Sequence, residues 1–166
     1  MENSIILYSS KLNNMCLGFI MITIQEMNGH ARKIVLAYEK ALHPLAQETN
    51  LPHTAISILL FIANSAAPTT ARDICKLRGL KKTIVSTHVE RLVVEGYIER
   101  QAISGDRRKD ALVCTDRAIK VIEAGRVRQI RFAEEVLHGI SEDDRIVMER
   151  CFTTMNENID RIIKEK

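Results

Sequence analysis

The sequence has no tryptophan, and only 4% of its 166 residues are aromatic. Proline and glycine are also scarce, at 3 and 7 residues, while hydrophobic residues reach 46%. These proportions exclude a collagen-like chain and a chain that is disordered throughout. A core with so few aromatic rings must be aliphatic, which suits packed helices better than a β-sandwich. The length allows one well-buried domain, and we expect a single domain over residues 1–166.

Paired cysteines and long apolar runs are absent too. The cysteines at positions 16, 75, 114 and 151 form no CxxC pair, and no histidine stands at metal-ligand spacing from them. No cleavable signal pattern precedes them, so we expect reduced thiols in a cytoplasmic protein without a metal site. The longest apolar run, residues 15–24, is about half the length that spans a bilayer, which argues against a membrane protein.

Motifs that carry catalytic chemistry are missing as well. The sequence shows no Gly-rich phosphate loop, no constellation of paired carboxylates and no nucleophile elbow. We therefore expect that the protein is not an enzyme and that it has no cofactor.

Positive charge is concentrated in the middle of the chain, although the formal net charge is only +3. Residues 71–110 carry ten Lys and Arg against six Asp and Glu, whereas residues 1–70 balance at four against four. Residues 111–166 are slightly acidic, at ten against eleven. This distribution is typical of a polyanion-binding module that lies between neutral structural parts.

Apolar residues at helical spacing predict a long amphipathic helix over about 25–48, with Pro44 bending or interrupting its end. A second helix follows, with Pro52 placed like a first-turn proline and with Asn64 and Ser65 closing it. The state of residues 1–24 is not predicted, because they contain few strong helix formers.

A short third helix is predicted from its end signals. Thr70 is an N-cap with Asp73 three residues later, which is a capping box with Asp in place of Glu. Ile74 and Leu77 would face inward, and Gly79 would end the helix.

The fourth predicted helix follows at once and stops at Gly96. Its apolar stripe consists of Ile84, Val85, Val89, Leu92 and Val93. Two short helices joined by a tight turn that contains glycine are the signature of a helix-turn-helix.

Two short strands, "YIERQAI" and "DALVC", then enclose the charged stretch "SGDRRKDAL" at 104–112. We expect this stretch to be the Gly-marked tip of a β-hairpin, with residues 106–110 on the turn. A tip with so many charges buries nothing, so it is either solvated or in contact with an anion.

The C-terminal part predicts two more helices. Thr115 is a good N-cap for the first, which Gly139 ends, and Ser141 with Asp144 is a second variant of the capping box. The apolar stripe of the first helix is Ile119, Ile122, Val127, Ile130, Ala133 and Leu137. The stripe of the last helix is Met148, Phe152, Met155, Ile159 and Ile162.

This order of elements resembles the MarR family of bacterial winged-helix transcription regulators. The most specific stretch is "VERLVVEGYIERQAISGDRRKDALVCT", in which Asp106 and Arg108 fill the family's Asp-x-Arg positions in the wing. The resemblance implies a mostly α fold (α+β winged helix): a helix-turn-helix with a two- or three-stranded β-wing. The winged helix would span 51–114, and residues 1–50 and 115–166 would form long dimerisation helices.

The resemblance also implies which residues meet double-stranded DNA. A recognition helix fits the major groove, where short polar side chains reach bases and cations reach phosphates, while a wing arginine enters the minor groove. On this reading Asp106 orients the wing arginines rather than touching DNA, and Arg91 is placed for a phosphate. The implied DNA-binding residues are Thr70, Lys81, Lys82, Thr83, Ser86, Thr87, Arg91, Asp106, Arg107, Arg108 and Lys109.

Two positions in or near this set, Lys81 and His88, depart from the family pattern. Lys81 stands where a Ser or Thr cap is common, so the recognition helix lacks an evident side-chain cap and Lys81 is a candidate phosphate ligand. His88 stands at a commonly aliphatic position, where it is either a partly buried packing residue or a base contact or pH switch.

The implied function is that of a homodimeric regulator that binds a pseudo-palindromic operator and represses by promoter occlusion, with activation left open. A small aromatic or phenolic effector, which the sequence does not identify, would release it from DNA. Two alternatives remain: a thiol-based redox regulator of the same fold that acts through Cys16, and a winged-helix adaptor for other proteins without operator binding. The polar face of Thr83, Ser86 and Thr87 argues against the adaptor.

Overall fold

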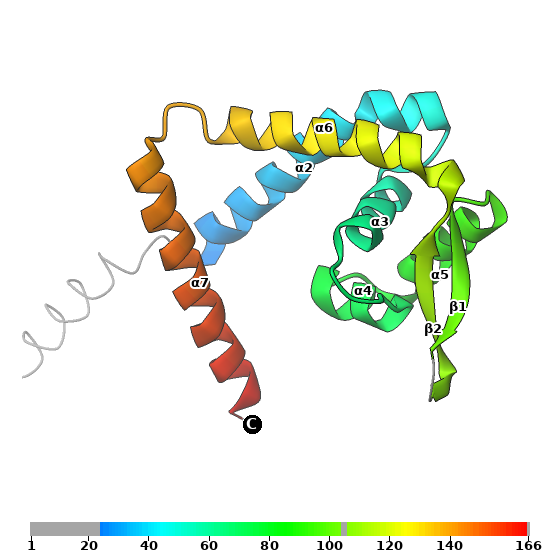
Figure 1. Ribbon diagram of the computed structural model, residues 1–166. Coiled ribbons are helices and arrows are strands. Elements are labelled where there is room, and N and C mark those ends of the chain that lie inside the picture. The colour runs from blue at the N-terminus through cyan, green and yellow to red at the C-terminus, as the bar shows by residue number, and fades with distance from the viewer. Residues whose placement is uncertain (1–23, 104–105, 166) are drawn as a thin grey trace, which may run out of the picture. The chain divides into compact units, whose positions relative to one another are not determined.

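The computed structural model describes residues 24–103 and 106–165, which form helices and one small antiparallel sheet (Figure 1). The chain divides into two compact units, one up to Gln129 and the other from Ile130. The first unit holds the helix-turn-helix and the sheet. The single domain expected over 1–166 stays a prediction.

Helix α2 (Ile24–Thr49) confirms the first expected helix, and Pro44 does not interrupt it. Pro44 removes one backbone hydrogen bond, but Leu42 and Leu45 on either side of it are only 1% and 2% exposed. Their packing holds this part of α2 against the core. The helix ends at Thr49, and Asn50 after it has a positive φ of 54°, as residues that follow a helix often do.

Helix α3 (His53–Asn64) lies at the centre of the core of the first unit. Pro52 is its N-cap rather than its first helical residue, and Ser65 closes it as expected. Residues on most sides of this helix are buried, because α2, α5 and the sheet all pack against it. The buried residues of α3 are Ala55, Ile56, Ile58, Leu59, Leu60 and Ile62.

Helix α4 (Ala71–Arg78) begins with the predicted capping box and ends at Gly79, whose φ of 62° is left-handed. The expectation that Leu77 faces inward is wrong, because its side chain is 68% exposed. The face of α4 that packs on the core runs through Ala71, Ile74 and Cys75. Leu77 lies roughly 100° around the helix from the middle of that face.

Helix α5 (Lys82–Val94) completes the helix-turn-helix and stops before Gly96, which has a φ of 74°. Val85, Val89 and Leu92 are buried as expected. Ile84 of the same apolar stripe is 39% exposed.

The wing is a two-stranded antiparallel sheet of β1 (Ile98–Ile103) and β2 (Asp106–Cys114). The backbone of Thr69 adds an isolated bridge to Leu112, whose N–H donates to the Thr69 carbonyl at 2.8 Å. This bridge anchors the segment before α4 to the sheet.

Residues 106–110 were expected on the hairpin turn, and this expectation is wrong because they belong to β2. Ala102 pairs with Asp110 and the next residue, Ile103, pairs with Asp106, so the register shifts there. The residues of β2 between those two partners are Arg107, Arg108 and Lys109. The extra residues are accommodated as an irregularity of the strand.

After the wing, the chain enters a short 3₁₀ helix, η1 (Asp116–Ala118), and then α6 (Ile119–Val136). Thr115 stands at the N-cap position, but its hydroxyl donates to the Gly96 carbonyl at 2.6 Å and does not cap the helix. In α6 the buried residues are Val121, Ile122 and Gly125, whereas Ile119 of the predicted apolar stripe is 49% exposed.

The second unit contains the end of α6 and helix α7 (Glu142–Lys164). Ser141 caps α7 by accepting a hydrogen bond from the Asp144 N–H at 3.2 Å, which confirms the cap. None of the residues of α7 is buried. Among the described residues, no helix is both long enough and apolar enough to span a lipid bilayer.

Candidate nucleic-acid interface

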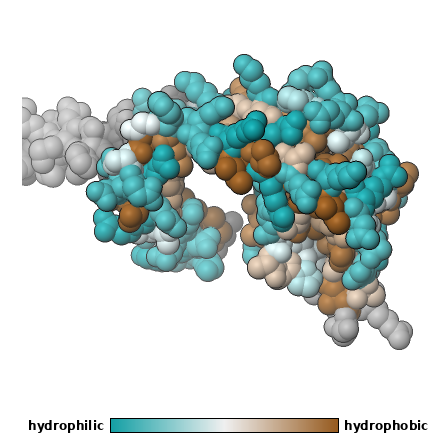
Figure 2. All heavy atoms as spheres, turned by 45° about the horizontal axis from the view of Figure 1, so that its top comes forward, coloured by the Kyte–Doolittle hydropathy of each residue, from teal (hydrophilic) through white to brown (hydrophobic). Residues whose placement is uncertain are grey.

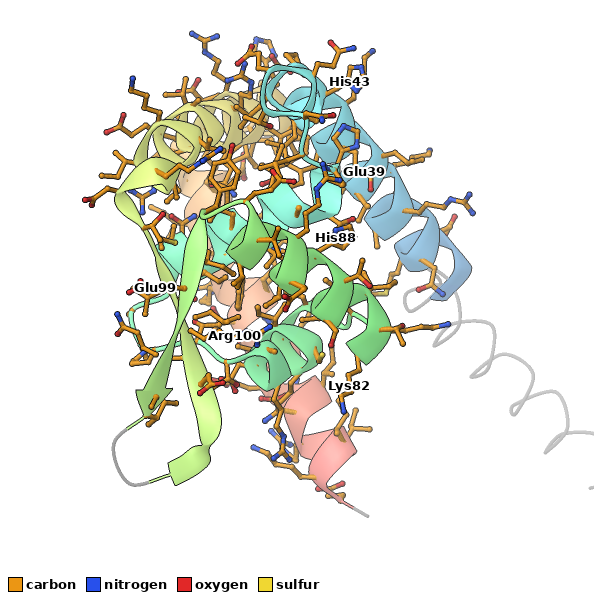
Figure 3. The ribbon with its side chains drawn as sticks, turned by 90° about the vertical axis from the view of Figure 1, so that its right-hand side faces the viewer. Glu39, His43, Lys82, His88, Glu99 and Arg100 are labelled. Atoms are coloured by element: carbon orange, nitrogen blue, oxygen red, sulfur yellow. The ribbon has the colours of Figure 1, made fainter. Side chains whose placement is uncertain are left out.

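The leading face of α5 is exposed, polar and positively charged. Lys82, Thr83, Ser86 and Thr87 are all exposed, and Figure 3 shows Lys82 at the start of the helix. The first turn of α5 contains no acidic residue, and Lys81 at the N-cap position makes no side-chain cap. The unsatisfied N–H groups and the positive end of the helix dipole add to the lysine charges there.

Thr70 and Thr87 already use their hydroxyl groups within the chain. Thr70 Oγ1 accepts from the Asp73 N–H at 3.2 Å and donates to the Asp73 carboxylate at 2.7 Å. Thr87 Oγ1 donates to the Thr83 carbonyl at 2.9 Å, which leaves its lone pairs free for a further donor. Capping therefore accounts for Thr70, while Thr87 can still accept a hydrogen bond at the helix surface.

Arg91 is held by two groups of the chain itself. Its Nε donates to Glu95 Oε1 at 2.7 Å, and its Nη2 donates to the backbone carbonyl of Asn50 at 2.5 Å. The second bond joins α5 to the end of α2. The role of Arg91 as a phosphate ligand stays a prediction. Its two bonds within the chain give it a role in positioning the recognition helix.

The wing residues 106–109 have a described backbone on β2. Their strand runs antiparallel to β1, and β1 contacts the helix α5. The sheet therefore carries the basic residues of the wing on the element that follows the recognition helix, as a winged helix requires.

An ion pair that the sequence did not predict connects the recognition helix to the wing. Arg100 Nη2 on β1 lies 2.9 Å from Glu90 Oε2 on α5. Arg100 also lines a groove of about 890 Å³ between α4 and the wing, together with Arg72 and Lys76. The excess of positive charge over residues 71–110 was the only sequence signal for a basic surface here. It could not predict that Arg72, Lys76 and Arg100 line the same groove.

His88 is partly buried, as expected for a packing residue. Its Nδ1 is enclosed and has no hydrogen-bond partner in the described structure. Burial lowers the pKa of His88, and the nearby Arg91 charge lowers it further. The neutral imidazole is therefore favoured at this position.

The cysteines differ in their surroundings. Cys75 and Cys114 are half-buried, Cys151 is exposed, and burial raises the pKa of the Cys114 thiol. A raised pKa favours the unreactive thiol form. Cys16, the candidate redox residue, lies outside the described residues, so its role stays a prediction.

Comparison with known proteins agrees with this geometry. Residues 49–109 match the model of the MarR family. The chain is 23% identical over 129 residues to the uncharacterized HTH-type transcriptional regulator YwoH of Bacillus subtilis (strain 168), covering 78% of this chain and 90% of YwoH.

Solved structures show the same fold. A MarR transcriptional regulator from Methanosarcina mazei Go1 superposes with a TM-score of 0.67 at 17% identity, over 83% of this chain and 96% of that one. A MarR-family regulator from Listeria monocytogenes, solved in complex with 26-mer DNA, has a TM-score of 0.68 at 15% identity. The match covers 82% of this chain and 87% of that one.

The fold and the exposed basic face thus define a winged helix-turn-helix protein. Its segment 49–109 matches the model of the MarR family of transcriptional regulators, which confirms the resemblance drawn from the sequence. This family and the similar structures are regulators rather than enzymes, in agreement with the expectation above.

Proposed function

We propose that this protein is a sequence-specific regulator that binds double-stranded operator DNA as a homodimer. The observation that carries this proposal is the exposed face of Lys82, Thr83, Ser86 and Thr87 at the start of α5. Short hydroxyl side chains can exchange hydrogen bonds with base edges in the major groove, and lysines neutralise phosphates. The wing, with Arg107 and Arg108 on β2, would reach the adjacent minor groove.

The homodimer is supported by apolar side chains that the chain leaves exposed. In Figure 2 hydrophobic patches interrupt the hydrophilic surface. On α2, Ile34 and Val35 are 51% and 55% exposed, and on α7, Phe152 and Ile162 are 57% and 71% exposed. Leaving large apolar residues in water along whole helices is costly, so a second copy that covers them would be favoured.

In such a dimer each subunit would present one recognition helix to one half-site, about one DNA turn apart, so the operator would be a pseudo-palindrome. The proposed output is repression, because a dimer that covers a promoter excludes polymerase. The cytoplasmic location expected from the sequence stays a prediction.

The proposed effector is a small aromatic or phenolic anion. A cavity of about 200 Å³ is lined by apolar and polar residues of α2 and α3 and by Arg78 and Leu80. The lining residues of α2 and α3 are Val35, Tyr38, Glu39, Leu42, His53, Thr54 and Ser57. This volume lies below the range for drug-sized ligands, which suits a single ring. Arg78 donates to Ser57 Oγ at 2.6 Å and supplies the positive charge that an anion needs.

The test is a fluorescence-anisotropy titration of the full chain with its own upstream intergenic DNA, at two salt concentrations and with excess nonspecific competitor. The expected result is tight binding that resists the competitor. In sedimentation, the binding species should have twice the mass of one chain. Binding that collapses with competitor would contradict operator recognition and favour the adaptor. Thr83→Ala and Ser86→Ala should relax sequence preference, whereas the exposed Thr153→Ala on α7 is the matched control.

A further inference from the structure

Two histidines meet across the turn between α2 and α3. His43 Nδ1 lies 3.3 Å from His53 Nε2, and the ring centroids are 5.5 Å apart with the planes at 59°. When both rings are neutral, one nitrogen carries the shared proton and the other offers a lone pair. If the proton moves to another ring nitrogen, the lone pairs of His43 Nδ1 and His53 Nε2 both point into the space between the two rings.

The separation of these nitrogens matches that of two ligands on one tetrahedral metal ion. Zn–N distances of about 2.0–2.1 Å at a tetrahedral angle place two imidazole nitrogens about 3.3–3.4 Å apart. We propose that His43 and His53 form a binding site for a divalent transition metal ion that favours imidazole, such as Zn²⁺ or Ni²⁺. The ion would replace the shared proton and would join α2 to α3.

The surroundings of the pair leave room for the rest of a coordination shell. His43, His53, Glu39 and His88 line one cavity of about 520 Å³. Glu39 stands one helical turn before His43 on α2, and Figure 3 shows both of them with His88 of α5 nearby. His43 is exposed and His53 is half-buried, so an ion could reach both nitrogens from solvent.

The protein would supply two nitrogen donors to this ion. No group of three or more His, Cys, Asp or Glu side chains in the described part of the chain is placed to hold a metal. Water would therefore complete the shell, with the Glu39 carboxylate as an additional donor after rotation of its side chain. A shell with open positions of this kind gives weaker binding than a closed structural site.

Metal titration of the full chain without an affinity tag tests the proposal. After removal of adventitious metal with a chelator, ZnCl₂ is titrated by calorimetry at pH 7.5. The expected result is one saturable site that His43→Asn and His53→Asn each weaken at least about tenfold, since even changes outside the ligand shell cost roughly 10–100-fold. His30→Asn, an exposed histidine on the same helix α2, should leave binding unchanged.

Thermal unfolding supplies a second readout, because an ion that binds only the folded chain raises the melting temperature. Zn²⁺ should raise it for the wild-type chain and for His30→Asn, and should leave it unchanged for His43→Asn. Glu39→Gln should weaken binding only modestly if water fills most of the shell.

Either of two results would overturn the proposal: no saturable Zn²⁺ or Ni²⁺ binding by the wild-type chain, or binding that survives substitution of either histidine. The second result would assign the ion to another group, such as a cysteine. None of these readouts involves DNA, so their failure would leave the proposed regulatory function untouched.

Discussion

The guanidinium of Arg91 on the recognition helix donates a hydrogen bond of 2.5 Å to the backbone carbonyl of Asn50, the residue that follows α2. Asn50 has a left-handed backbone, with φ at 54°, which turns the chain from α2 into α3. The same guanidinium is held by Glu95 at 2.7 Å. The end of the long helix α2 and helix α5 are thus joined by one side chain.

Arg91→Ala should lower the free energy of unfolding by about 1–2 kcal/mol, because it removes a bond to a backbone carbonyl and a partly exposed ion pair. Urea unfolding measures this loss. The matched control is Arg100→Ala, which removes an exposed pair with Glu90 and should stay within roughly 0.5 kcal/mol. Unchanged stability together with a smaller salt slope for DNA binding would instead assign Arg91 to a phosphate.

Arg108→Ala should weaken binding to operator DNA by roughly 1–3 kcal/mol if its side chain enters the minor groove. Anisotropy titrations at several salt concentrations measure both the affinity and the salt slope, which should fall if a phosphate is also neutralised. Arg131→Ala, an exposed arginine of the second unit, serves as the charge-matched control. An affinity equal to that of the wild-type chain would remove the wing from the mechanism.

Gly125→Ala should destabilise the first unit by roughly 1–2 kcal/mol, since overpacking outweighs the gain in helix propensity. A Cβ at this position would lie 2.6 Å from a Leu60 methyl carbon. Leu60 is fully buried and has little room to move away.

The control for Gly125→Ala is Gly29→Ala on α2, where the added methyl meets nothing within 4 Å. There the substitution should raise stability by up to about 1 kcal/mol. A second variant, Leu60→Ala, opens space beside position 125. Chemical denaturation of the double variant should show a loss smaller than the sum of the single losses, and strict additivity would show that the two sites do not touch.

His88 should make folding stability depend on pH below about 6.5. Burial first, and the Arg91 charge second, lower the pKa of His88 in the folded chain, so the unfolded chain binds its proton more readily. The free energy of unfolding therefore rises with pH through this range. It falls as the pH drops below the pKa of His88 in the unfolded chain and approaches the lower pKa of His88 in the folded chain.

Urea midpoints at pH 7.5 and pH 5.5 measure this dependence on pH. His88→Gln should reduce the difference between the two midpoints, whereas His138→Gln, an exposed position in the second unit, should not. An equal pH dependence in wild type and His88→Gln would show that other groups account for it.

Local signals predicted the ends of the elements well, because they depend on neighbours in the chain. The capping box of Thr70 and Asp73 and the left-handed Gly79 appear where the sequence placed them. The same type of signal was wrong at Thr115, since its hydroxyl instead donates to the carbonyl of Gly96, a distant residue. A cap is certain only when no tertiary partner competes for the same side chain.

The sequence by itself determined the winged helix-turn-helix order, the polar leading face of α5 and the concentration of basic residues near the wing, since periodicity, caps and charge are properties of nearby residues. Tertiary structure alone decided that Leu77 and Ile84 face solvent, because the orientation of a short helix depends on which neighbours pack against it. It also decided that Arg91 reaches Asn50 and that His43 meets His53. Each of these pairs joins elements across a turn or across the core, and only folding brings such residues within bonding distance.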